Sequence, residues 1–216
     1  MDLRSVDELL TTTRAVRRRF DLGRPVDPAL VEECLTIALQ APSGSAAQGW
    51  HFLVVTDPAL RRSIGDAYRE AFEGVYEARR VAYPADDPRS KVVPRVMESA
   101  MYLAQHMHQV PVHVIPCLRT RVDGVSLVAQ AAAWGSILPA AWSFMLAARS
   151  RGLGTVWTTV HLRFADRVQS LLGIPDDYIQ AALIPVGHYR GDSFKPASRL
   201  PLAQVSSWNR WGSRRA

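Results

Sequence analysis

The chain has 216 residues, of which 48% are hydrophobic, and a formal net charge of +6. That length suits one domain with a sizeable core. Its two cysteines, Cys34 and Cys117, stand far apart in the sequence, which excludes a disulfide scaffold and a cysteine-rich zinc site and fits a reducing cytoplasm.

The first part of the chain predicts three helices and one strand. The N-terminal ten residues carry acids and no continuous apolar run, so they do not form a signal peptide. A hydroxyl cap at Ser5 starts a helix that runs towards Arg14. An Asp-Pro pair starts each of the next two helices, over 27–39 and 57–72. Between these two helices, the apolar and β-branched run 50–56 predicts a short strand.

The remainder alternates between strands and helices. Prolines and mixed charges over 79–94 predict an exposed loop, and a helix is expected from Arg95 to about His108. The tail 190–216 has little periodicity and is expected to wrap along a surface, such as that of a partner subunit. Further elements are expected as strands over 112–118, 154–159 and 181–186 and a helix over 166–172. Few strands separated by helices indicate an α/β or α+β protein with one central sheet, a single domain over 1–216.

One stretch, 124–148, contains no charged residue and is long enough to span a bilayer. It is rich in alanine, however, and contains Gln130, Ser136 and Pro139, which make it a poor membrane anchor. We therefore expect one long helix or two consecutive helices, buried on all sides in the core or in a large dimer interface, and no membrane association.

Four arginines lie within the six residues from Arg14 to Arg19, near the end of the first predicted helix. Clustered guanidinium groups suit a terminal phosphate, because several charge-assisted hydrogen bonds can converge on it. The alternative is a solvated basic helix face, which composition alone favours. The other basic residues are scattered and do not form a stripe with interleaved aromatic residues. The sequence therefore gives little support for a nucleic-acid partner.

Three further segments could contact a ligand. The loop 41–50 is rich in small residues and hydroxyls, so its backbone N–H groups can approach a ligand closely. The segment 152–159 opens with glycines and ends in hydroxyls, and amides at a strand end suit a flavin ring. The segment 194–201 is basic and stiffened by proline. Each segment also has an ordinary structural alternative. The loop 41–50 could be a plain turn, 152–159 a core strand, and 194–201 a solvated arm.

Other chemistries find little support in the sequence. It contains no Rossmann fingerprint, P-loop, HExxH or GxSxG motif. His106 and His108 stand two residues apart on a predicted helix, so they cannot share a face to bind one metal. His161 and His188 stand alone beside predicted strand ends and are expected to be structural or surface residues. No metal site is expected.

The order and spacing of these segments resemble the FMN-dependent nitroreductase family. The resemblance extends from about Thr13 to Pro201 and rests on RAVRRRF, ALQAPSGSAAQGWHFLVVTD, GLGTVWTT, LLGIPDDY, ALIPVGHYRG and SRLP. It implies a three-layer αβα fold of the α+β class with a central mixed sheet, long buried dimer-core helices and an extended C-terminal arm. It also implies a homodimer with FMN at its interface, which passes hydride from NADPH or NADH to a small oxidised acceptor, a nitroarene or a quinone, by ping-pong kinetics.

The resemblance also implies roles for particular residues. The phosphate and ribityl end of FMN would be held by Arg14, Ala15, Val16, Arg17 and Arg18, with Arg199 from the tail. The loop residues Pro42, Ser43, Gly44 and Gln48 would approach FMN, often from the partner subunit. The strand-end residues Trp157, Thr158 and Thr159 would face the isoalloxazine ring. No catalytic side chain is implied, because the flavin carries the chemistry.

Two positions depart from the family pattern. Ala46 stands where an asparagine is usual, so one polar contact to FMN worth about 1 kcal/mol is missing. An extra arginine precedes Phe20, which leaves open which of Arg17, Arg18 and Arg19 faces the phosphate. Two alternative functions follow: a flavin-binding or flavin-consuming relative without NAD(P)H-driven turnover, and a basic binding module for nucleic acid or an acidic partner.

Overall fold

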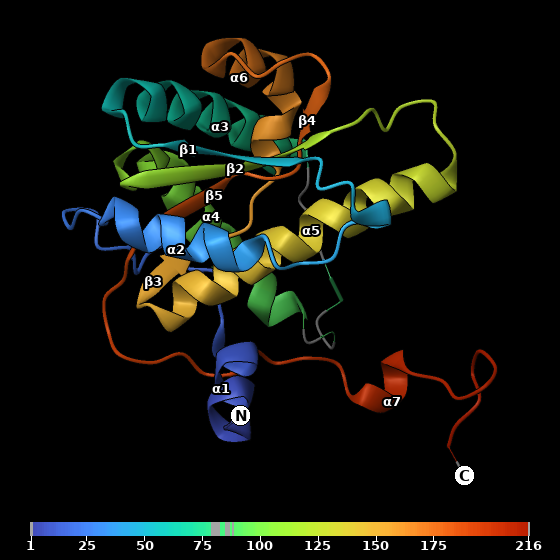
Figure 1. Cartoon of the computed structure of the whole chain (residues 1–216). Helices are drawn as coiled ribbons and strands as arrows, with labels where there is room; N and C mark the ends of the chain where they lie inside the picture. The colour runs from blue at the N-terminus through green and yellow to red at the C-terminus, as the bar shows by residue number, and fades with distance from the viewer. Residues whose placement is uncertain (1, 79–82, 85–86, 88, 216) are drawn as a thin grey trace.

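The fold was analysed in a computed structural model, which describes residues 2–78, 83–84, 87 and 89–215. A central sheet lies between two helical layers, which is the expected three-layer α+β arrangement (Figure 1). The strands are β1 (Trp50–Val55), β2 (Val112–Arg119), β3 (Leu153–Thr155), β4 (Tyr178–Gln180) and β5 (Ile184–His188).

The strands follow the order β1-β2-β5-β3, and β4 pairs with β2. All pairs of named strands are antiparallel. Among the described residues, the expected mixed sheet has parallel character only in an isolated bridge between Ala15 and Thr155. The predicted strand 154–159 ends at Thr155, and the predicted strand 181–186 corresponds to β5, which begins at Ile184.

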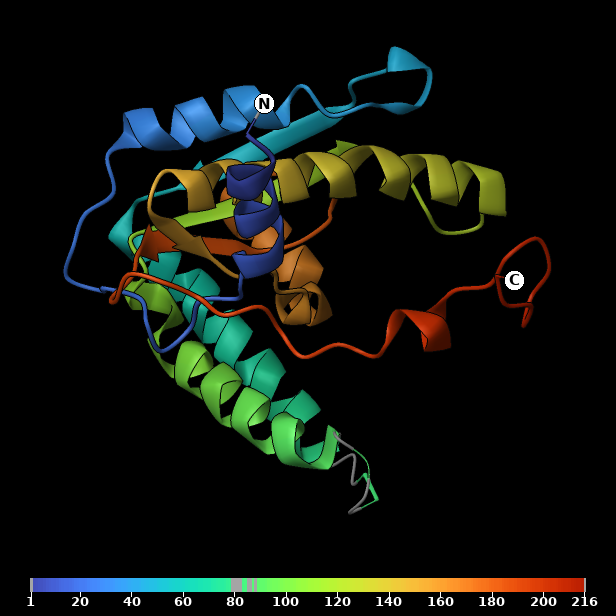
Figure 2. The same ribbon diagram turned by 90° about the horizontal axis from the view of Figure 1, so that it is seen from below.

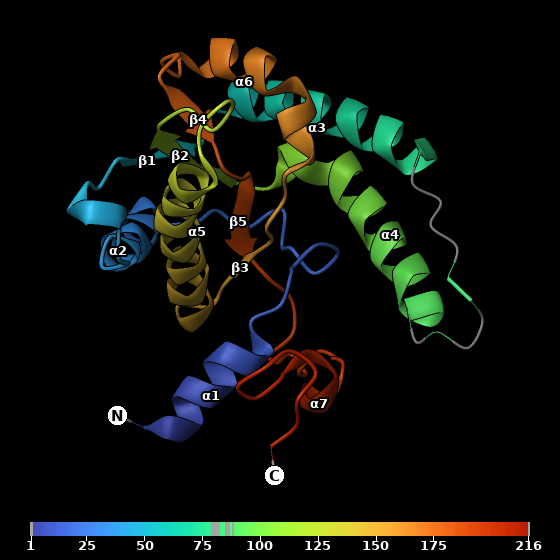
Figure 3. The same cartoon turned by 90° about the vertical axis from the view of Figure 1, so that its right-hand side faces the viewer.

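Each face of the sheet buries its own apolar cluster. Helices α2 (Pro28–Ala38) and α5 (Leu127–Ser150) cover one face, where Cys34, Phe144 and Ile184 are fully buried. The other face is covered by α3 (Pro58–Ala78), α4 (Arg89–His106) and α6 (Ala165–Leu172), as Figure 3 shows. Short 3₁₀ turns complete the order: η1 (Gly44–Ala46), η2 (Met107–Gln109) and η3 (Val160–Phe164).

Local signals explain where most helices begin. Asp27 caps α2 by accepting a hydrogen bond from the Ala29 N–H, and Asp57 accepts one from the Leu60 N–H at the start of α3. The first helix, α1 (Leu3–Thr12), is capped by Asp2 and not by Ser5 as predicted. The Asp2 carboxylate can accept from two successive backbone N–H groups, so the helix gains a turn at its start.

The loop predicted over 79–94 is too long. Residues 89–94 already belong to α4, with Pro94 inside the helix, and residues 79–82, 85–86 and 88 lie outside the described part of the chain. Pro94 stands in the second turn, where it removes one hydrogen bond. Packing of α4 along α3 compensates for that loss (Figure 3).

Helix α5 is a single helix that continues through Pro139, but it is not buried on all sides within one chain. Its second half lies in the core, whereas Leu127 and Val128 near its start are about four-fifths exposed, at 80% and 79%. By length and composition α5 could cross a membrane, but its buried second half packs between α2 and the sheet as a core helix does.

The tail extends away from the body of the molecule. After Tyr189 the chain is largely extended up to the short helix α7 (Leu202–Val205), and residues 198–215 are exposed. Figure 2 shows this segment running along the body and then leaving it. That the tail wraps along the surface of a partner subunit stays a prediction.

Candidate active site

The arginine-rich segment lies directly beside the start of the predicted flavin strand. Ala15 forms a parallel bridge to Thr155, and the Val16 N–H donates to the Thr155 carbonyl at 2.9 Å. The Val16 side chain is buried, and Phe20 pairs with Tyr189 at the end of β5. The fold thus brings together two segments that are far apart in the sequence.

Gly154 makes this close approach possible. A Cβ atom at position 154 would lie 2.8 Å from Cγ2 of Val16, which is closer than real Cβ contacts allow. Val16 cannot move away without breaking its hydrogen bond to Thr155. Glycine is therefore required here by space, not by backbone conformation.

Replacing Gly154 by alanine is expected to lower the free energy of unfolding by about 1–3 kcal/mol, the usual cost of overpacking a core. Urea unfolding monitored by circular dichroism measures it. The matched control is Gly74→Ala in α3, where an added Cβ meets nothing within 4 Å. The control should be stabilised by about 0.5–1 kcal/mol. A Gly154→Ala protein as stable as the parent would show that Val16 is not held where we describe it.

The four arginines of this segment diverge. Arg14 donates to the Lys195 carbonyl at 2.6 Å. Arg18 forms an exposed ion pair with Glu98 of α4, with 2.6 Å between Nη2 and Oε1. Arg19 turns towards the base of the tail, where it donates to the Arg190 and Ser193 carbonyls. Arg17 is half-buried and has no carboxylate partner among the residues that the structure describes.

Arg17 belongs to a polar cluster with Tyr68 and Thr158. Burial lowers the pKa of the Arg17 guanidinium, and the neighbouring Tyr68 partly offsets this effect. Burial also raises the pKa of Tyr68 to about 12, against the opposing effects of Arg17 and of a hydrogen bond with Thr158. Arg17 stays charged and Tyr68 stays protonated, so the cluster holds a positive charge that no carboxylate of the described residues compensates. An anion would balance it.

The strand-end residues 157–159 leave the sheet after β3. The Thr158 hydroxyl is buried and donates to the Leu183 carbonyl at 2.9 Å, so it does not point towards open space as a flavin contact would. Thr159 is exposed and Trp157 is half-buried. Within the described part of the chain, the backbone N–H groups of Trp157 and Thr159 have no acceptor.

The loop 42–48 does not reach this site within one chain. It lies at the far ends of α2 and α5 from β3, as Figures 1 and 2 show. It is exposed and held by bonds from the Gly44 N–H to the Ser136 hydroxyl at 3.0 Å and from the Gln48 N–H to the Ser43 hydroxyl at 3.2 Å. Ser45, Ala46 and Gln48 have positive φ angles, of 52°, 53° and 46°. For such residues a left-handed backbone is uncommon and often marks a functional loop.

Arg199 in the tail is exposed, and its guanidinium bonds only to the neighbouring Ser198 carbonyl among the described residues. Four residues earlier, the Lys195 carbonyl accepts from Arg14. The tail therefore passes the arginine-rich segment shortly before Arg199, and the assignment of Arg199 to a phosphate stays a prediction.

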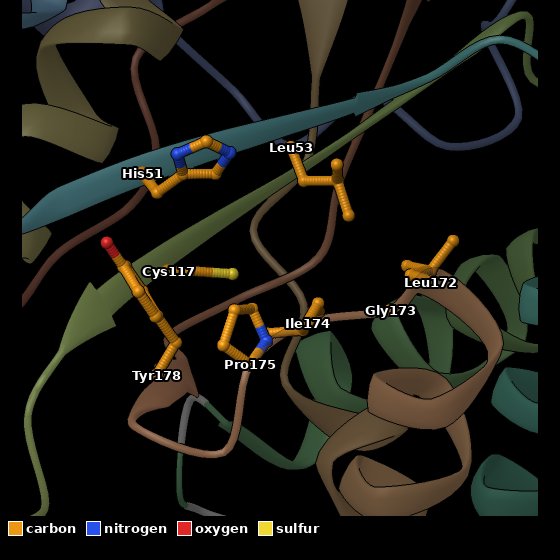
Figure 4. A pocket seen from close by; sticks show the side chains of 8 residues that line it. All are labelled: His51, Leu53, Cys117, Leu172, Gly173, Ile174, Pro175 and Tyr178. Atoms are coloured by element: carbon orange, nitrogen blue, oxygen red, sulfur yellow. The ribbon is translucent and has the colours of Figure 1, made fainter.

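A separate cavity of about 190 Å³ opens between β1, β2 and the loop that joins α6 to β4 (Figure 4). Its lining is mostly apolar, with the rings of His51 and Tyr178 at one end, 6.1 Å apart between centroids, and Leu172 at the other. Burial raises the pKa of the Cys117 thiol in its wall to about 12, which keeps the thiol protonated. No residue of the predicted cofactor site lines this cavity.

The histidines play no part in a metal site among the described residues, where no suitable group of ligands is found. His161 is fully buried, as is His113, which the sequence did not single out. The sequence also missed Tyr68 and Glu98, the partners of Arg17 and Arg18. Tyr68 stands at helical spacing between Ile64 and Phe72, a pattern that indicates core packing and not a polar contact.

The comparisons with known proteins identify the family and the fold. The Nitroreductase family model matches residues 10–188. The "NADH dehydrogenase" of Thermus thermophilus is 30% identical over 207 residues, which cover 90% of this chain and 91% of the relative. The "Nitrobenzene nitroreductase" of Ectopseudomonas oleovorans is 26% identical over 227 residues, with 93% and 92% covered.

A solved structure has the same fold: an oxidised iodotyrosine deiodinase bound to FMN and 3-iodo-L-tyrosine. It aligns with a TM-score of 0.72 at 21% identity, over 92% of this chain and 96% of the deiodinase chain. The family match covers most of the chain, and both curated relatives are oxidoreductases. The chain therefore belongs to the nitroreductase family of oxidoreductases.

Proposed function

We propose that this protein is an FMN-dependent oxidoreductase that transfers hydride from NADPH or NADH to a small oxidised acceptor, such as a nitroarene or a quinone. The observation that carries the proposal is the half-buried charge of Arg17, which has no carboxylate partner among the described residues. It is supported by the backbone N–H groups of Trp157 and Thr159, for which the described residues offer no acceptor. A phosphorylated flavin needs a cationic group at one end and hydrogen-bond donors at its ring.

The residues present fit FMN. Arg14 and Arg17 would hold the phosphate and ribityl end, with Ala15 and Val16 as the backbone between them, and Arg199 would join them from the tail. Arg18 is assigned a weaker, long-range role because Glu98 already neutralises it. Residues 157–159 would hold the ring, with Thr158 acting through its backbone because its hydroxyl is engaged.

Bound FMN would supply the hydride-transfer chemistry, and this chain's residues would bind and stabilise it. The N–H groups of Trp157 and Thr159 would donate to ring acceptors. No side chain is assigned as a proton donor. We propose that donor and acceptor occupy the same place in turn, which gives ping-pong kinetics.

We further propose a homodimer. The loop with Pro42, Ser43, Gly44 and Gln48 lies at the end of α5 away from β3, so it would complete the site of a partner and not that of its own chain. The exposed apolar side chains of α5, which are Leu127, Val128, Leu138 and Trp142, would be covered in that dimer. Two buried, free thiols fit a reducing compartment, and we propose the cytoplasm.

The test is a visible absorption spectrum of the purified protein, followed by NADPH, and separately NADH, without oxygen. Loss of the flavin band, and its return on adding a quinone or a nitroarene, is the expected result. Free FMN at the same concentration with the same donors is the control for uncatalysed reduction.

Two outcomes would replace the proposal. Bound FMN that neither donor reduces would favour a flavin-handling relative without NAD(P)H-driven turnover, in keeping with the missing amide at Ala46. A colourless protein that does not take up added FMN would remove the cofactor, and salt-sensitive DNA binding would then be tested.

A further inference from the structure

We propose that Arg19 and Arg149 clasp the base of the C-terminal tail and act as positioning residues for the part of the tail that contains Arg199. The tail clasp consists of Arg19, Arg149, Tyr189, Gly191 and Phe194. That the clasp fixes the tail follows from the contacts below, and only its effect on a cofactor rests on the proposed function.

Arg19 makes five separate contacts with residues at the base of the tail. Its Nε donates to the Arg190 carbonyl at 2.7 Å, and its Nη1 donates to the Ser193 carbonyl at 2.9 Å. Its guanidinium also lies over the ring of Phe194, 4.1 Å from the centroid, and 5.5 Å from that of Tyr189. Its own carbonyl accepts from the Arg190 N–H at 2.8 Å. A planar fork can serve two carbonyls and a ring at once, which a lysine cannot.

Arg149, near the end of α5, approaches the same two rings. Its Nη1 donates to the Tyr189 hydroxyl at 2.8 Å, and its guanidinium lies 5.6 Å from the Tyr189 centroid and 5.2 Å from that of Phe194. The two rings lie 5.0 Å apart. Two arginines without a carboxylate partner among the described residues thus hold one aromatic pair by cation–π contacts.

Gly191 allows the tail to turn into the clasp. Its φ angle is +80°, a conformation that side chains other than glycine rarely adopt. A Cβ at this position would also lie 2.8 Å from Nη2 of Arg19. Alanine at position 191 would therefore disturb the clasp without changing any charge.

The clasp is the last place before Arg199 where several contacts hold the tail to the body. After Phe194, the only hydrogen bond from the described tail residues to the body is that of the Lys195 carbonyl to Arg14. Pro196 then stiffens the chain. The clasp and the single bond from Arg14 together limit the positions that Arg199 can reach, and loosening the clasp would leave only that one bond to hold the tail.

The experiment compares the parent with Arg19→Met, Arg19→Lys and Gly191→Ala, and uses Arg62→Met as the control, an exposed arginine on α3. Chymotrypsin reports on the tail, because it cleaves after Phe194 only when that side chain is released. The cleavage rate is measured by mass spectrometry on FMN-free protein, and the dissociation constant for FMN by quenching of FMN fluorescence. Melting curves verify that each variant is folded.

We expect Arg19→Met and Gly191→Ala to raise the rate of cleavage after Phe194 by about tenfold. Arg19→Lys, which keeps the charge and loses the fork, should lie between them and the parent. The FMN dissociation constant should rise by about fivefold in Arg19→Met and Gly191→Ala, and by less in Arg19→Lys. Arg62→Met should match the parent in both measurements.

Unchanged cleavage in Arg19→Met and in Gly191→Ala would overturn the clasp. Faster cleavage with an unchanged dissociation constant would overturn the positioning role. If the parent binds no FMN, the proposed function and the positioning role both fail, and the cleavage rates still decide whether the clasp holds the tail.

Discussion

Replacing Arg17 by methionine is expected to weaken FMN binding by about a hundredfold, whereas the same change at Arg18 should alter the dissociation constant by less than about threefold. The two arginines are neighbours in the sequence and equally able to bind phosphate. The structure separates them by their surroundings, so the pair gives a matched comparison.

The difference arises from charge compensation. Arg17 is half-buried beside Tyr68 and has no carboxylate partner among the described residues, so a phosphate would provide the counter-charge that the site lacks. Loss of a charge-assisted hydrogen bond costs about 1.5–3 kcal/mol, and each 1.4 kcal/mol is a factor of ten. Arg18 and Glu98 already form an exposed pair, which contributes little and leaves no uncompensated charge.

FMN titrations of the flavin-free protein measure both variants, with fluorescence quenching as the readout. Arg199→Ala should also weaken binding strongly, and Arg17→Lys should fall between Arg17→Met and the parent because it keeps the charge but loses the fork. If Arg18→Met loses FMN and Arg17→Met retains it, the phosphate lies on the α4 side of the segment, and our assignment of Arg17 is wrong.

The sequence predicted those elements whose ends are set by local chemistry. Helix α2 begins where Asp27 caps it and Pro28 takes the first helical position. Helix α3 begins in the same way at Asp57 and Pro58. The strand at Trp50 follows from its β-branched residues. In each case the deciding interactions lie within a few residues along the chain.

Elements that depend on distant contacts were missed. Pro94 indicated a loop, but α4 packs against α3 and the helix continues through the proline. The three-residue strand β4 exists because Gln180 meets Cys117 of β2, which no local pattern encodes. The apolar start of α5 was expected to be buried, and within one chain it is exposed.

In the candidate site, too, local features could be predicted from the sequence and features set by distant contacts could not. The order of its segments could be predicted, because each segment has a recognisable composition. The directions of its side chains could not, because Glu98, Tyr68 and the tail carbonyls decide them. The sequence left Arg17, Arg18 and Arg19 equivalent, and three different partners give them three different positions.

Acid is expected to destabilise this protein through two buried histidines. His113 and His161 are both fully buried, and burial lowers the pKa of each to about 4, with the charges of Arg61 and His108 acting in the same direction on His113. Nε2 of His113 donates to the Met107 carbonyl at 2.9 Å, and neither ring nitrogen of His161 has a partner among the described residues.

The direction follows from proton binding. The folded-state pKa values lie below the unfolded value of about 6.5, so the unfolded chain binds more protons between pH 6.5 and 4. Stability is therefore complete above pH 6.5 and falls as the pH drops towards 4. Each histidine contributes a slope of up to about 1.4 kcal/mol per pH unit, or about 3 kcal/mol over the whole interval.

Substitution of His161 by phenylalanine should remove about half of this slope. It should also leave stability at pH 7.5 equal to or above that of the parent, because a buried imidazole without partners is replaced by an apolar ring of similar shape. Urea unfolding at half-unit steps of pH measures the free energy of unfolding of the variant and of the parent. The carboxylates contribute equally to both proteins, so their contribution cancels in the difference. His51→Gln, at an exposed histidine, is the control and should keep the parent's slope. A His161→Phe protein with the full slope would contradict the prediction, because it would mean that His161 gains protons as readily in the folded state as in the unfolded state.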